Sequence, residues 1–102
     1  MNIKIDSTDF EVVYVSDVRY YMEMRGGGDI WRIIAKAQNH PAVNPGEYVL
    51  PTNPKSYNKN TKRFTTNSGR VYEIVSFAQD QSEEKFEQQI LKDIEKGGYE
   101  IH

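Results

Sequence analysis

Alternation of apolar and polar side chains is clearest in the first quarter of the chain. Every second residue of the segment 18–24 is apolar, and the residues between them are charged or tyrosine. Strict period-two alternation is typical of a half-buried strand. Residues 2–6 and 10–15 are also strand-like, with a turn expected at 16–17 before the third segment. The pattern predicts an antiparallel meander over residues 2–25.

The period changes after three consecutive glycines. Gly26–Gly28 should end the strand, because glycine loses much backbone entropy in an extended segment. Asp29 is a suitable N-cap for a following helix. In residues 30–38, isoleucine and alanine recur at three- and four-residue spacing, and Pro41 prevents a longer helix. We predict a short helix in this segment.

The second half of the chain has one more helix signal among strand signals. Residues 46–50 form a short strand candidate, and residues 70–77 form the strongest strand candidate, preceded by a hairpin turn at Gly69. A helical pattern runs from a capping box at Asp80 to Lys96 and stops at two glycines. The last residues, 99–101, could add a short strand.

These elements predict one α+β domain covering residues 1–102. Their order is β-β-β-α-β-β-β-α-β, which favours a mainly antiparallel sheet of five or six strands with two helices packed on one face. Exposed edges of such a sheet would also allow homodimerisation.

Composition narrows the class of protein. The 102 residues include no cysteine, which excludes a disulfide framework, a thiolate metal site and a cysteine nucleophile. No apolar run approaches the roughly 18 residues of a membrane span, and the first ten residues lack a signal-peptide pattern. We therefore expect a small cytoplasmic protein without membrane contact.

Catalytic and cofactor motifs are not recognisable. The two histidines, His40 and His102, have neither metal-binding nor acid–base spacing. The glycine triplet matches neither of the common phosphate-binding patterns. We predict a non-enzymatic protein with no metal and no cofactor.

The segment 51–68 is the most informative part of the chain. It contains three lysines, one arginine and no acid, although the net charge of the protein is -2. Its only large apolar side chains are aromatic and could stack on a base. We interpret it as a long basic polar loop within the domain, with a solvated hairpin connection as the alternative. The predicted ligand-binding residues are Lys55, Tyr57, Lys59, Lys62, Arg63, Phe64 and Arg70, and the secondary candidates are Arg25, Trp31 and Arg32.

Charge is distributed unevenly along the chain. From Glu73 onward, eight acids stand against three lysines, so a basic end and an acidic helix face are expected. This asymmetry favours a binding module that holds an anionic partner, either a nucleotide-like ligand or nucleic acid, through the basic loop. The alternative is a small inhibitor or adaptor that docks on a protein target and blocks it, as accessory proteins of phages and mobile elements do.

Overall fold

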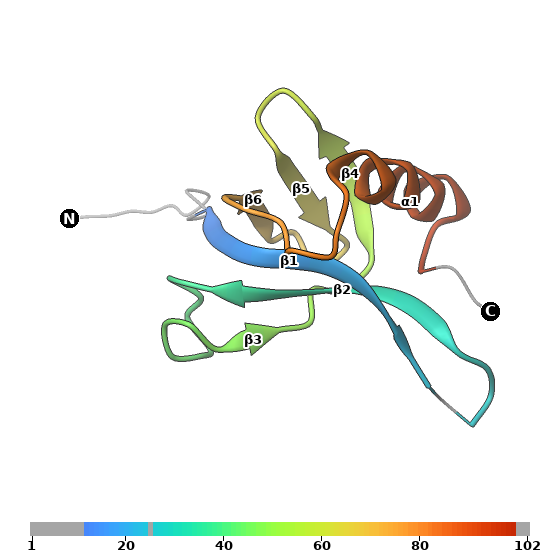
Figure 1. The fold of residues 1–102 in the computed structure, drawn as a ribbon, viewed down its shortest axis with the longest axis horizontal. Coiled ribbons are helices and arrows are strands. Elements are labelled where there is room, and N and C mark those ends of the chain that lie inside the picture. Colours follow the sequence, from blue (N-terminus) through green and yellow to red (C-terminus); the bar gives the residue numbers. More distant parts are fainter. Residues whose placement is uncertain (1–11, 25, 100–102) are drawn as a thin grey trace.

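A single six-stranded sheet and one helix make up the computed structural model, which describes residues 12–24 and 26–99 (Figure 1). The strand order in the sheet is β3-β2-β1-β6-β5-β4. The elements are β1 (Val13–Glu23), β2 (Ile30–Ala37), β3 (Tyr48–Val49), β4 (Pro54–Asn58), β5 (Arg63–Thr66), β6 (Val71–Ile74) and α1 (Glu83–Lys96).

The predicted arrangement of two helices on an antiparallel sheet is wrong in two respects. The described residues contain one helix, and the sheet is mixed because β1 and β6 pair in parallel. In that pair Val13 lies opposite Tyr72 and Val15 opposite Ile74. No local pattern marks this pairing, since the two strands are far apart in the chain.

The segment predicted as the first helix is strand β2. Ile33, Ala35 and Ala37 are fully buried and alternate with partly exposed Ile34 and Lys36, which is a period of two. Its isoleucine spacing fits a helix as well as a strand, but β-branched residues pack well on a pleated sheet. Pairing with β1 on one side and β3 on the other decides between the two.

Strand β1 replaces the two strands predicted at 10–15 and 18–24. The expected turn at Ser16–Asp17 is a bulge, where the pairing register with β2 shifts between Ser16 and Arg19. Asp17 has a φ of 55° there. A bulge bends a strand without ending it, and β1 continues as one long curved strand (Figure 1). The strand predicted at 2–6 lies outside the described residues. Of the strand predicted at 99–101, the structure describes only Tyr99, which is not in a strand.

Helix α1 confirms the second predicted helix, although its N-cap is Ser82 and not Asp80. The Ser82 side chain accepts a hydrogen bond from the backbone N–H of Lys85, and Gly97 ends the helix with a φ of 81°. Buried Phe86 contacts the rings of Tyr20 and Phe77, with centroids 5.2 and 5.1 Å away. These contacts fix the helix against one face of the sheet.

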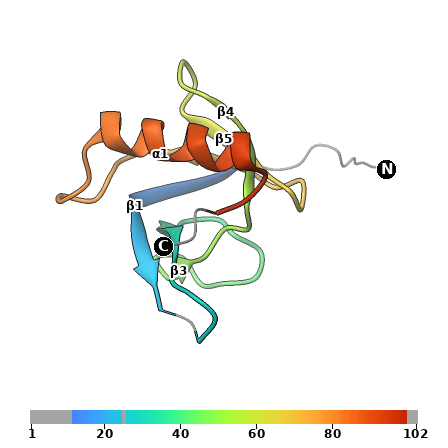
Figure 2. The same cartoon turned by 90° about the vertical axis from the view of Figure 1, so that its right-hand side faces the viewer.

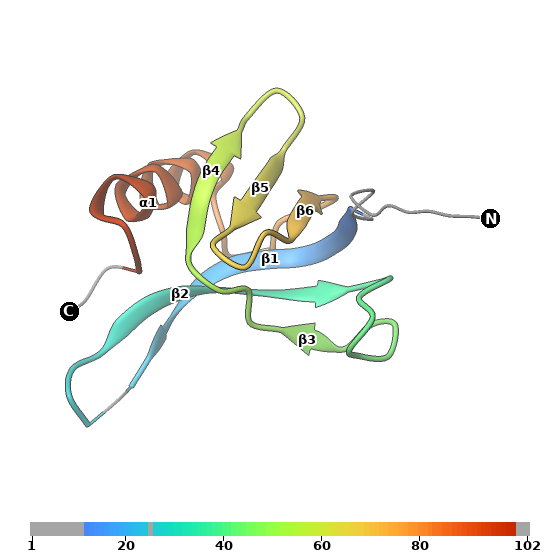
Figure 3. The same cartoon turned by 180° about the vertical axis from the view of Figure 1, so that it is seen from behind.

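The two faces of the sheet differ in what covers them. Figure 2 shows α1 lying across the sheet near β4, and Figure 3 shows the other face, over which no helix of the described chain lies. No helix in residues 12–24 and 26–99 is long and apolar enough to cross a membrane.

Candidate functional site

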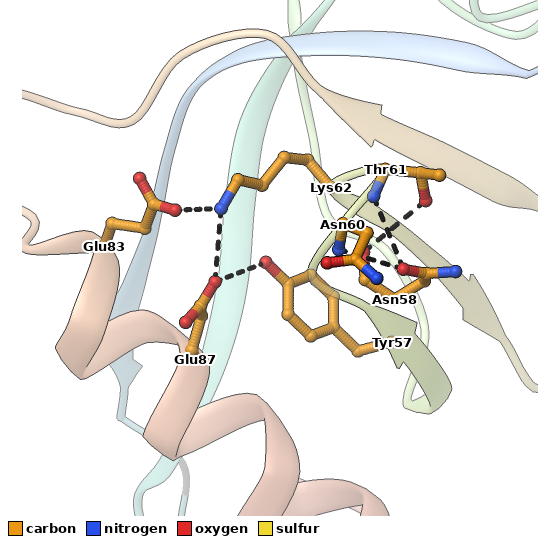
Figure 4. Close-up of polar contacts among 7 residues, drawn as sticks. All are labelled: Tyr57, Asn58, Asn60, Thr61, Lys62, Glu83 and Glu87. Carbon is orange, nitrogen blue, oxygen red and sulfur yellow. Dashed lines mark hydrogen bonds and ion pairs between the residues drawn. The ribbon is translucent and has the colours of Figure 1, made fainter.

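The segment predicted as a basic loop is itself a hairpin. Residues 51–68 contain both β4 and β5, which are joined by a four-residue turn at positions 59–62. Asn58 shapes this turn, because its side-chain Oδ1 accepts hydrogen bonds from the N–H groups of Asn60 (2.9 Å) and Thr61 (3.4 Å). Lys62 closes the turn in the left-handed conformation, with a φ of 60°. This geometry directs the Lys62 side chain toward α1 (Figure 4).

A polar network joins the hairpin to the first turns of α1. The ammonium group of Lys62 forms ion pairs with Glu83 and, at 3.3 Å, with Oε2 of Glu87. The phenol of Tyr57 donates a hydrogen bond of 3.1 Å to the same Glu87 oxygen (Figure 4). Two carboxylates of the helix therefore bind the hairpin, and Glu87 is shared by Lys62 and Tyr57.

The network shifts the pKa values of its members. Burial, and then the hydrogen bond to Glu87, raise the pKa of the Tyr57 phenol, so this group stays protonated at neutral pH. The hydrogen bond to Glu83 is the main cause that raises the pKa of the Lys62 ammonium group. Lys62 is thus a cation that two carboxylates already compensate.

An open groove lies between the hairpin and α1, beside this network. Its volume is about 230 Å³. The lining side chains come from β4, from the turn that follows it and from the helix: Tyr57, Lys59, Glu84, Glu87, Gln88 and Leu91. Leu91 is 54% exposed, although the rest of the apolar stripe of α1 faces the sheet. The groove therefore combines an exposed apolar side chain with a lysine on the strand side and carboxylates on the helix side.

The structure separates the predicted ligand-binding residues into different environments. Tyr57, Lys59 and Lys62 belong to the groove and its network. Arg63 forms an ion pair with Glu73 on the neighbouring strand β6, at 2.9 Å.

Phe64 is fully buried and stacks on the ring of Tyr72, with centroids 5.1 Å apart. Its ring is therefore not accessible for stacking on a base.

Three predicted cations form no ion pair with any residue of the described chain: Lys55, Lys59 and Arg70. Lys55 and Arg70 lie toward the end of the hairpin opposite to Lys59, because Pro54 pairs with Thr66 there and Asn58 with Arg63 at the turn. The basic residues do not form one cluster.

The secondary candidates have structural roles where the structure describes them. The Arg32 side chain is only 14% exposed, forms an ion pair with Glu23 and donates hydrogen bonds to the carbonyl groups of Leu50 and Pro51. Trp31 is partly buried and packs against the core. Arg25 lies outside the described residues.

His40 lies in the segment between β2 and β3, where it contacts Ala42 and Tyr72. Its Nδ1 accepts a hydrogen bond from the N–H of Ala42, and its ring stacks on Tyr72. Burial, and then the nearby Arg70, lower the pKa of this imidazole. Within residues 12–24 and 26–99, no three histidine or acidic side chains lie close enough together to hold a metal ion.

Sequence reasoning missed the helix side of the groove. It predicted a helix with an acidic face there and did not connect Glu84, Glu87, Gln88 or Leu91 with the basic segment 51–68. The available signal was the stripe itself, since Phe86, Ile90 and Ile94 already make a continuous apolar face without Leu91.

Comparisons with protein families, with curated proteins and with solved structures gave no match for this chain.

Proposed function

We propose that this protein is a small adaptor or inhibitor that docks on another protein through the groove between the β4–β5 hairpin and α1. The observation that carries this proposal is the exposed Leu91 beside Tyr57 in an open groove with a polar rim. An apolar centre surrounded by polar and charged side chains is typical of a protein-binding surface.

The charges around the groove favour a protein segment over a small anion. Lys62 is compensated by Glu83 and Glu87, and Arg63 by Glu73. An anion entering the groove would meet Lys59 but also the carboxylate of Glu84 on the facing wall. A peptide can satisfy both signs of charge and cover Leu91 at the same time.

The anion-binding hypothesis stays a prediction for Lys55, Lys59 and Arg70. These cations keep their charge available, because none is paired within the described residues. Their separation along the hairpin leaves Lys59 alone in the groove. If the protein binds an anion, replacing these three cations should weaken that binding, whereas protein docking depends on Leu91.

Selection from a displayed library of random peptides tests the docking proposal. Peptides of about 12 residues are longer than most strands and can span the groove. We expect Leu91→Ser to weaken the selected peptides at least about tenfold, which corresponds to about 1.4 kcal/mol. Val75→Ser is the matched control, since Val75 is an exposed aliphatic residue (64%) outside the groove. Failure to select any peptide, or equal binding to both variants, would contradict the proposal.

A further inference from the structure

Strand β4 ends the sheet on the side of the groove. It pairs with β5 alone and is the terminal strand of the described sheet. An edge strand can accept a further strand only if its outward N–H and C=O groups are available. Their directions follow from the hydrogen bonds of the neighbouring strand.

The backbone groups of β5 alternate between its two neighbours. The N–H of Thr66 donates to the carbonyl group of Arg70 at 3.0 Å, which is the direction of β6. The N–H of Asn67 donates to the carbonyl group of Asn53 at 2.8 Å, on the side of β4. Successive residues of a strand direct their N–H and C=O groups to opposite sides. The backbone groups of Thr65 therefore point toward β4, like those of Asn67.

The same alternation places the Tyr57 backbone at the open edge. Ser56 pairs with Thr65 and Asn58 with Arg63, so Ser56 and Asn58 direct their N–H and C=O groups to β5. Tyr57 lies between them and directs its N–H and C=O away from β5. The N–H and C=O of one residue are the groups with which an edge strand forms a hydrogen-bonded pair with an added strand.

The first half of β4 is protected against such pairing. Pro54 has no N–H, and the register with β5 is irregular between Pro54 and Ser56. Proline and bulges are the usual means of blocking an edge strand. The Tyr57 end has neither, and it is the end that lines the groove with Leu91.

We infer that the partner contributes an extended segment that adds to β4 at Tyr57 as a further strand and lies in the groove against α1. This inference rests on the proposed docking function and specifies its occupant. Alternate side chains of an added strand would face the helix.

Charge complementarity specifies one of these side chains. Glu84 lines the groove and forms no ion pair with a described residue, whereas Glu83 and Glu87 share Lys62. A lysine or arginine of the segment would therefore lie near Glu84. An apolar side chain on the same side of the segment would cover Leu91.

A methyl scan of the backbone of a selected peptide tests the strand addition. N-methylation removes one N–H at a time, and an added strand uses only every second N–H toward β4. Tyr57 offers one carbonyl group at the unprotected end of β4, so we expect methylation of the single peptide N–H that pairs with it to weaken binding at least about tenfold. Methylation at the two adjacent positions, whose N–H groups point away from β4, should change binding about twofold at most. The amide hydrogen of Tyr57 should exchange more slowly when the peptide is bound.

A variant of Glu84 tests whether the partner segment has a lysine or arginine near this carboxylate. We expect Glu84→Gln to weaken the peptide about fivefold and to reduce the salt dependence of its binding. Glu47→Gln is the matched control, since Glu47 is an exposed glutamate outside the groove. An unchanged affinity in Glu84→Gln would overturn the assignment of a basic residue to the segment.

The outcomes separate this inference from the docking proposal. If Leu91→Ser weakens binding but no single backbone methylation weakens it more than methylation at the adjacent positions, and Tyr57 exchange is unchanged, strand addition is wrong and groove docking stands. If Leu91→Ser has no effect, the docking proposal itself is wrong. A dimer detected by sedimentation without peptide, and dissociated by Leu91→Ser, would show that a second copy of this chain occupies the groove and would overturn the inference.

Discussion

The phenol of Tyr20 donates a hydrogen bond to the carboxylate of Asp93, with 2.6 Å between Oη and Oδ2. Tyr20 lies on β1 and Asp93 on α1, so the bond joins the helix to a central strand of the sheet. The Asp93 side chain is fully buried, and a buried carboxylate requires hydrogen-bond donors. Together with the ring contacts of Phe86, this bond holds α1, and with it the helix wall of the groove, against the sheet.

Removing the donor should destabilise the fold. Tyr20→Phe keeps the ring that packs on Phe86 but takes a hydrogen bond from the buried Asp93 carboxylate. We expect the free energy of unfolding to fall by about 1–3 kcal/mol, measured by urea denaturation at pH 7. The control Tyr14→Phe, at a position 41% exposed, should change it by less than about 0.5 kcal/mol. Equal effects of the two variants would show that the Tyr20–Asp93 bond is not a principal support of the helix.

The left-handed backbone of Lys62 predicts that glycine is more stable than alanine at this position, and that the order is the opposite at Lys59. The left-handed conformation destabilises the folded protein by about 1–2 kcal/mol when the residue is alanine. This exceeds the roughly 0.4–1 kcal/mol by which glycine favours the unfolded chain through its greater entropy. Both Lys62→Ala and Lys62→Gly lose the contacts with Glu83 and Glu87, so their difference reports the backbone alone.

We therefore expect Lys62→Gly to be more stable than Lys62→Ala, by up to about 1 kcal/mol in urea denaturation. At Lys59, in the same turn but without a positive φ, the alanine variant should be the more stable one. The same order of stability at both positions would contradict the assigned turn geometry.

The two segments read as helices show how far local pattern determines the fold. For α1, the spacing of Phe86, Ile90 and Ile94 and the terminal Gly97 identify the helix from local sequence alone. The isoleucines of residues 30–37 satisfy both periods, and the choice is made by strands β1 and β3 that flank them. Sequence could therefore predict α1, whereas β2 and the parallel β1–β6 pair depend on contacts distant in the chain.

The candidate site was predictable in part for the same reason. Sequence identified the region, since Tyr57, Lys59 and Lys62 do contribute to the groove and its network. It did not identify their partners, because Glu83 lies 21 positions after Lys62, on a separate acidic helix. The polar composition of residues 51–68 also concealed two strands, one of which buries Phe64.

The raised pKa of Tyr57 predicts a stability loss at alkaline pH. In the unfolded chain this phenol ionises near pH 10, whereas the folded protein keeps the proton to higher pH. Above about pH 10 the native state then binds more protons than the unfolded state, so the stabilising effect present below that pH is lost as pH rises. Tyr57→Phe removes this contribution and should make the loss of stability less steep.

Urea denaturation of wild type and Tyr57→Phe between about pH 7 and 11 measures this effect. The two stabilities should converge as pH rises. Glu87→Gln should also reduce the steepness, since the Glu87 carboxylate helps to raise the Tyr57 pKa. A difference between wild type and Tyr57→Phe that stays constant over this range would exclude a raised pKa at Tyr57.

A direct test against an anionic partner uses two charge-matched triple variants. The first replaces the unpaired hairpin cations by glutamine (Lys55, Lys59 and Arg70), and the second replaces three helix lysines (Lys85, Lys92 and Lys96). If protein docking is the function, wild type should bind single-stranded DNA only non-specifically, with a dissociation constant of about 10⁻⁴–10⁻⁶ M at physiological salt. Both sets of substitutions should then weaken DNA binding to a similar extent. Fluorescence anisotropy with a labelled oligonucleotide over a range of salt concentrations measures this. Tight binding that only the hairpin variant abolishes, with a reduced salt dependence, would contradict the docking proposal and support the anion-binding hypothesis.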